Sequence, residues 1–359
     1  MVVMKKSVLA LAVLGAFAGA VSAQSSVTLY GRLDTAVTWT DPNSNGSVVG
    51  GEEGDAVFRL NGHDPIGGSR WGMRGSEDLG GGLKANFVIE SGFQSDTGVA
   101  SSGPGGSTRL FDRQAFVGLS STSLGEIRLG RQQTLTREVD LIVGDISGEG
   151  ELTVQTAVAP GRFLYQNFGN RVDNAVQYIT PNFGGFQIRG LVAAGEGSAA
   201  RQQGVALMYA AGPLKAGLSY EAYADGPGAD GSYNEVVLLG ASYNFGFATL
   251  LASYQNTTDF GTATSDTVLV GGAQVEDHQG YNVGVMVPFG AFQFRAQYTQ
   301  STLERDGASD LDQEKAGVSL RYSLSKRTQL YTVLTKISGD DDEAFNRDTQ
   351  VTFGVGHNF

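Results

Sequence analysis

The last nine residues, VTFGVGHNF (351–359), alternate strictly between two kinds of side chain. The larger side chains share one parity: Val351, Phe353, Val355, His357 and Phe359. Threonine, glycine and asparagine occupy the other parity. Because a strand turns successive side chains to opposite faces, this strand is apolar on one face and small or polar on the other. Such a strand, ending on an aromatic residue, is typical of one that closes a membrane β-barrel, with lipid on one face and water on the other.

The same period of two recurs along the whole chain, and charged side chains fall almost wholly on the parity opposite to the apolar ones. Examples are residues 83–90, 214–221, 292–298 and 315–322. Short connections alternate with long polar ones, which is the asymmetry of outer-membrane barrels. The long connections are 41–65, 94–108, 260–277 and 340–346.

Successive strands read as hairpin neighbours rather than as partners in the Greek-key crossovers of a two-sheet sandwich. We therefore predict an all-β fold: one closed antiparallel up-and-down transmembrane β-barrel of about sixteen strands over residues 24–359. In this barrel the closing strand pairs with residues 27–37, which removes the sheet edge. It takes no part in selectivity.

The N-terminus has the pattern of a secretory leader. Lys5 and Lys6 form a basic start, residues 8–20 are apolar, and residues 21–23 are small. The apolar run is shorter than the roughly 20 residues that span a bilayer, so we predict a signal peptide over residues 1–23. The chain has no cysteine, hence no disulfide framework. Its net charge is −12 and its basic residues do not cluster, which argues against nucleic-acid binding.

The longest interruption of the strand pattern runs over residues 134–170. A structureless segment of this length inside a compact domain is usually functional. In a barrel it can fold into the lumen, where its charged side chains would face water. Its first part carries Arg137, Glu138, Asp140 and Asp145.

Several segments together carry a family resemblance. They are YGRLDTAV (30–37), GSRWGMRGSEDLGGGLKANFVIE (68–90), RQAFVGLSS (113–121), GEIRLGRQ (125–132), RVDNAVQYITPNFGGF (171–186) and the terminal Phe359. The chain resembles the general porins of Gram-negative beta-proteobacteria, of the Burkholderiales and Neisseria type. The resemblance implies a homotrimer of 16-stranded barrels in the outer membrane, among its lipids and lipopolysaccharide. It also implies a third external loop folded inward as a constriction, and passive diffusion of small hydrophilic solutes and inorganic ions.

Selectivity in a water-filled channel comes from charged side chains that line its narrow zone. Side chains of lumen parity include Arg32, Arg74 and Arg128, and we place Arg59 with them. Six more share this parity: Lys84, Arg189, Lys215, Arg295, Lys315 and Arg321. If residues 134–170 present their acids opposite the arginines, a transverse field results.

The basic wall favours anions, whereas the acidic loops favour cations at the mouth. Loop charges act over about 8 Å at physiological salt, so we expect an anion-selective channel. A cation-selective or substrate-selective channel of the same fold is the alternative. Arg113 and Arg131 share the lipid-facing parity, where a charge is costly. We expect each at a strand end, beyond a bulge or in the trimer contact, and not in the pore lining.

Other classes of function have little support in the sequence. It has only three histidines (His63, His278, His357) and no HExxH or GxxxxGK motif, so no cofactor or metal site is predicted. A barrel-type outer-membrane enzyme stays an alternative because catalytic triads are recognised in space. An adhesive or structural barrel is a third class. The acidic run 340–343 could collect Ca²⁺ or bridge lipid phosphates through its carboxylate oxygens, but it lacks the spacing of a Ca²⁺ loop, so we favour a solvated loop.

Overall fold

The computed structural model describes residues 26–42, 56–61, 68–100, 109–143, 170–196, 201–224, 233–258, 269–270, 273–339 and 348–359. The predicted signal peptide, Asp145, most of the long interruption and the acidic run 340–343 lie outside these residues. Within the described part of the chain, no helix has the length and apolar character needed to cross a membrane.

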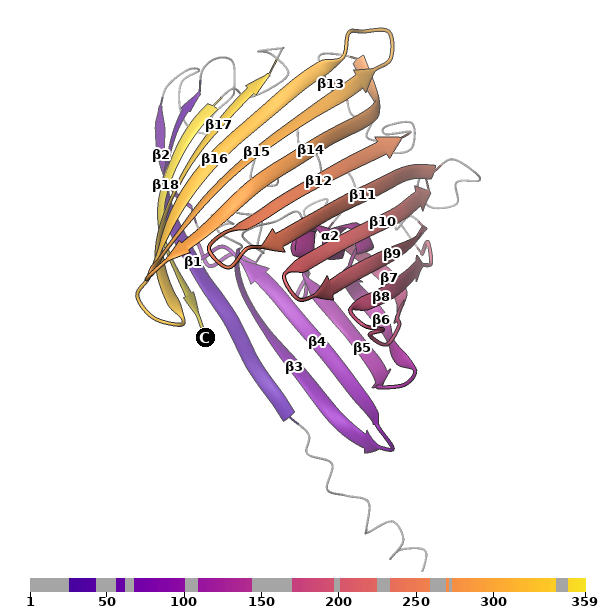
Figure 1. The fold of residues 1–359 in the computed structure, drawn as a ribbon. Coiled ribbons are helices and arrows are strands. Elements are labelled where there is room, and N and C mark those ends of the chain that lie inside the picture. Colours follow the sequence, from indigo (N-terminus) through magenta and orange to yellow (C-terminus); the bar gives the residue numbers. More distant parts are fainter. Residues whose placement is uncertain are drawn as a thin grey trace, which may run out of the picture.

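The strands form one closed antiparallel wall (Figure 1). They are β1 (Ser26–Pro42), β2 (Val57–Asn61), β3 (Ser69–Gly80), β4 (Leu83–Phe93), β5 (Gln114–Ser121), β6 (Gly125–Gln133), β7 (Arg171–Ile179), β8 (Phe186–Ala193), β9 (Gln202–Ala211), β10 (Leu214–Ala224), β11 (Tyr233–Asn244), β12 (Thr249–Thr258), β14 (Ala273–Phe289), β15 (Phe292–Arg305), β16 (Leu311–Ser323), β17 (Thr328–Gly339) and β18 (Asp348–Asn358). The short β13 (Leu269–Val270) pairs with the start of β14. The helix α2 (Leu135–Val143) interrupts the strand order.

Apart from β2 and β13, each described strand pairs with its neighbours in sequence, and β18 returns to β1. β2 and β3 share one edge of β1, opposite residues 36–40 and 26–32 respectively, so the two occupy one place in the wall. The described strands thus make a closed barrel of sixteen places. This confirms the predicted fold class.

The last strand closes the barrel against the first, as predicted, but its partner segment is shifted along β1. β18 pairs with β1 from Arg32↔Asn358 to Pro42↔Asp348, which includes residues 32–37 of the predicted range and extends beyond it. The difference follows from barrel geometry, because tilted strands can close only with a stagger between the first and the last. Phe359 extends the contact: its N–H donates to the Gly31 carbonyl group (3.0 Å), and the Gly31 N–H donates to the Phe359 carbonyl group (3.1 Å). Among the described strands, this pairing joins the last strand to the first, so neither β1 nor β18 presents an open edge to lipid.

The two faces of the wall have the polarity predicted from the alternation. Phe353 on β18 and Leu33 on β1 are 62% and 45% exposed on the outer face, whereas Arg32 and Asp34 are buried on the inner face. Polar side chains buried on the inner face include Gln177, Ser219, Gln255, Asn282 and Gln297. Apolar side chains outside and polar ones inside are the reverse of a soluble protein and fit a wall between lipid and a wet lumen.

Candidate functional site

The helix α2 lies on the inner side of β10 and β11 (Figure 1). Leu135, Val139 and Ile142 form its apolar stripe, at the spacing that puts them on one helix face. Leu135 and Val139 are fully buried in a cluster with Leu191 and Leu238, which come from the inner face of β8 and β11. The start of the long interruption is therefore an amphipathic helix docked inside the barrel.

The N-terminus of α2 is capped by Thr134. Its side-chain oxygen accepts a hydrogen bond from the Arg137 N–H (3.3 Å), and its carbonyl group accepts one from the Glu138 N–H (3.0 Å). Threonine is favoured at this position because it satisfies helix N–H groups that have no partner within the helix.

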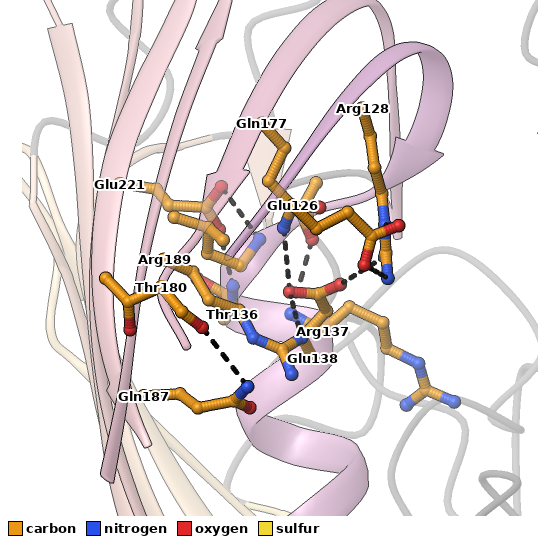
Figure 2. A network of polar contacts seen from close by, with 12 residues as sticks. Glu126, Arg128, Thr136, Arg137, Glu138, Gln177, Thr180, Gln187, Arg189 and Glu221 are labelled. Carbon is orange, nitrogen blue, oxygen red and sulfur yellow. Dashed lines mark hydrogen bonds and ion pairs between the residues drawn. The ribbon is translucent and has the colours of Figure 1, made fainter. Parts of the chain in front are cut away.

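Glu138 is the centre of a polar network drawn from four elements (Figure 2). Its Oε2 lies 2.7 Å from Nη1 of Arg189 on β8 and accepts a 2.9 Å hydrogen bond from Nε2 of Gln177 on β7. Its Oε1 lies 4.0 Å from Nη1 of Arg128 on β6. Arg128 also forms a bidentate pair with Glu126, with Nε–Oε1 of 2.9 Å and Nη2–Oε2 of 3.0 Å. Glu138 is thus paired with side chains of the adjacent strands β6, β7 and β8.

The remaining charges of α2 pair with each other. Arg137 forms an ion pair with Asp140 one turn further along the helix, and the Asp140 side chain is fully buried. The charges on and around α2 therefore nearly balance, and this sector of the lumen is a mixed-charge surface.

A second cluster joins the first strand, β1, to the last strands, β17 and β18. Nη2 of Arg32 lies 3.3 Å from Oδ2 of Asp34, and the Tyr331 hydroxyl group donates a 2.6 Å hydrogen bond to Oδ1 of Asp34. These side chains lie over two glycines of β18. A Cβ at Gly354 would lie 2.1 Å from Cζ of Tyr331, and one at Gly356 would lie 3.0 Å from Nη2 of Arg32. The glycines on the inner parity of β18 thus leave room for the network of Arg32, Asp34 and Tyr331.

A third cluster lies on β1, β3 and β4. The guanidinium group of Arg74 lies 5.2 Å from the centre of the Tyr30 ring, a cation–π distance. The Tyr30 hydroxyl group donates a 3.0 Å hydrogen bond to Glu90, which also pairs with Arg113 and lies 3.9 Å from Arg70. Arg113 precedes β5, at a strand end as predicted, but its side chain reaches the inner-face Glu90.

Arg131 has the outer parity of β6 by simple alternation, and the strand opposite it carries a bulge. The register of β6 and β7 shifts between Gly130 and Gln132, opposite Asn174, whose φ is +54°. The shift brings Asp173 beside Arg131, with Nη1–Oδ1 of 2.6 Å, and Arg109 approaches Asp173 to 2.7 Å. Arg131 thus lies beside a bulge, one of the three predicted positions, and its charge is paired with Asp173.

The predicted site residues fall into separate groups. Arg128, Arg137, Glu138 and Asp140 meet around α2, whereas Arg32 and Arg74 belong to the other two clusters. Arg59 is opposite Thr38 on the inner parity. Sequence reasoning did not identify the residues that these side chains meet: Asp34, Tyr30, Glu90, Glu126 and Gln177. Their parity marked several of them as inward-facing, but alternation carries no signal for which of them meet.

Comparison with known proteins gives this geometry its context. The family model of the Gram-negative porins matches residues 10–342. The chain belongs to the Gram-negative porin family. An outer membrane porin protein of Delftia acidovorans is 35% identical over 94% of this chain and 91% of its own length. One of Bordetella pertussis is 32% identical over 99% of this chain and 100% of its own length.

Among solved structures, the anion-selective porin from Comamonas acidovorans matches with a TM-score of 0.71 and 28% sequence identity, over 94% of this chain and 100% of that one. These matches confirm the resemblance to beta-proteobacterial porins. The porin is a channel of the outer membrane and is not an enzyme.

Proposed function

We propose that this porin lets small hydrophilic solutes and ions diffuse passively, with a preference for anions. The observation that supports an anion preference is the charge distribution on β15–β17. Their inner face holds Arg295, Lys315 and Arg321, all buried in the wall. The carboxylates described on these strands, Glu304, Asp312 and Glu314, all have the outward parity.

The basic wall and α2 lie on different sides of the lumen. Half the circuit of the barrel separates β6 from β15 and β8 from β17, so the Glu138 network and the basic strands are on opposite sides. Fixed charges in a water-filled passage with low-dielectric walls raise the local concentration of counter-ions. Within the described part of β15–β17 the inward charges are all positive, although Asp34 of β1 contacts Tyr331 there, so the charge of this wall favours anions. The similarity to a porin that is described as anion-selective supports this proposal.

The reversal potential across a planar bilayer with a KCl gradient tests the proposal. We expect the sign of a chloride preference, reduced when Arg321 or Arg295 is changed to Gln. Lys336→Gln is the matched control, because Lys336 is exposed on the outward parity of β17. A cation-selective potential, or equal effects of all three changes, would contradict the proposed role of this wall.

We also propose that residues 134–170 form the constriction, with α2 as its docked first part. Its position inside the barrel supports this role. Cleavage of residues 1–23 is proposed as well, and mass spectrometry of the mature N-terminus tests it.

A homotrimer surrounded by outer-membrane lipids and lipopolysaccharide is proposed on the basis of the outer face. Exposed aromatic side chains, which gather at membrane interfaces, are frequent from Tyr178 onward. Between residues 61 and 177, however, the exposed large apolar side chains in the described chain are all aliphatic. The described wall of β3–β6 therefore exposes fewer aromatic side chains than the rest of the outer face, as expected where protein replaces lipid.

A charged residue introduced on the outer face of β3–β6 tests the proposed trimer contact. Val117→Arg on β5 is expected to convert trimers to monomers on semi-native gels. Leu239→Arg on the outer face of β11 is the control, with a similar cost in lipid of about 2–4 kcal/mol at mid-bilayer. Dissociation by both changes, or by neither, would contradict the assignment of the contact to β3–β6.

A further inference from the structure

One strand of the wall makes three successive contacts with α2. Both carboxylate oxygens of Glu221 on β10 accept hydrogen bonds from the helix N-terminus: Oε1 from the Leu135 N–H (3.1 Å) and Oε2 from the Thr136 N–H (2.6 Å). Two residues earlier, Ser219 Oγ lies 3.4 Å from Oγ1 of Thr136. Two residues earlier again is Gly217, where an ideal Cβ would lie 2.7 Å from Cγ1 of Val139.

The other end of the helix and Glu221 itself are also held. Ser242 on β11 donates a 3.3 Å hydrogen bond to the Ile142 carbonyl group near the C-terminus of α2. Gln202 on β9 donates a 2.7 Å hydrogen bond to Oε1 of Glu221. Glu221 is fully buried, so its carboxyl group is fixed by these contacts. Figure 2 shows it beside Thr136 and close to the Glu138 network.

We propose that Glu221 is a positioning residue that locks α2 to the wall and so fixes the Glu138 carboxylate in the channel. A helix of nine residues has little stability of its own in water. Its first N–H groups have no partner within the helix, and a carboxylate there interacts favourably with the helix dipole. The expected effect of Glu221 on conduction rests on the proposed constriction by residues 134–170.

The charge contact is tested by Glu221→Gln, which keeps the size of the side chain but replaces one acceptor oxygen by an NH₂ group. Hydrogen–deuterium exchange of residues 135–143 in the trimer measures docking directly. Loss of one charge-assisted hydrogen bond lowers the docked-to-undocked ratio by roughly 10-fold. We expect exchange there to accelerate by about that factor. Exchange in the wall strands should be unchanged. The control Glu235→Gln, on the outward parity of β11, should leave exchange of residues 135–143 unchanged.

The steric contact gives a second test with built-in rescue. Gly217→Ala should push the helix away, because the new methyl group meets Val139. Adding Val139→Ala removes both clashing methyl groups and leaves a Cβ–Cβ distance of 3.4 Å. The double variant should therefore regain slow exchange and the single-channel conductance of the unmodified porin.

The readouts separate this inference from the proposed constriction. Faster exchange together with altered conductance and more frequent voltage closure in Glu221→Gln supports both. Faster exchange with unchanged conductance supports the anchor and overturns the proposed constriction by α2. Unchanged exchange in both Glu221→Gln and Gly217→Ala would overturn the anchoring role of β10.

Discussion

Replacing Gly354 by alanine is expected to destabilise the barrel strongly, although it adds one methyl group to a strand. The new Cβ would lie 2.1 Å from Cζ and 2.2 Å from the hydroxyl oxygen of Tyr331. Tyr331 is only 4% exposed, and its hydroxyl group donates a 2.6 Å hydrogen bond to the buried Asp34. Because the ring is buried, it can move aside only by displacing its neighbours. The methyl group must displace it and break that hydrogen bond.

Two costs add in this variant. Loss of a hydrogen bond to a buried carboxylate costs about 1.5–3 kcal/mol, and overpacking costs about 1–3 kcal/mol. We therefore expect Gly354→Ala to lower the free energy of unfolding by about 3–5 kcal/mol. Tyr331→Phe removes only the hydroxyl group, so its expected cost is the first of these, about 1.5–3 kcal/mol.

Urea titration of the porin in lipid vesicles, followed by tryptophan fluorescence, measures these free energies. Gly190→Ala is the matched control, because Gly190 is also a strand glycine but nothing lies within 4 Å of its ideal Cβ. Its effect should stay within about 0.5 kcal/mol. If the Gly354→Ala barrel is as stable as the Gly190→Ala barrel, the packing of Tyr331 on β18 does not stabilise the protein and the reasoning is refuted.

Three further predictions concern charge. Arg32→Ala or Arg74→Ala should each reduce the anion preference in reversal-potential measurements, and unchanged selectivity in both would remove them from the selective zone. Arg189→Gln leaves the carboxylate on α2 without its 2.7 Å partner, so cation permeability should rise in the same measurement. Asp173→Asn leaves Arg131 without its carboxylate on the outer parity. Because Asp173 lies near the end of β7 that joins the long loop, the change should lower the free energy of unfolding by about 1 kcal/mol, the upper end of the cost near a membrane interface. An unchanged urea midpoint would contradict the pairing.

The alternation of the sequence determined the wall of this porin. Side-chain direction in a strand is a local property, so parity alone placed Arg32, Arg128 and Arg189 inside and Leu33 and Phe353 outside. It also predicted the closure of the barrel by the last strand. The predicted partner segment, residues 27–37, overlaps the observed one only over residues 32–37, because stagger depends on the tilt of all the strands together.

The tertiary structure decided which inward residues meet. Glu138 comes from a segment without a period, and its partners Gln177 and Arg189 come from two strands further along the chain. No local pattern relates Glu221 to the helix that it holds, 85 residues earlier. Asn174 reverses the parity of Asp173 through one backbone angle. Parity tells which face a side chain takes, whereas register, bulges and helix docking are fixed by contacts between distant segments, and these contacts create the charged surface of the channel.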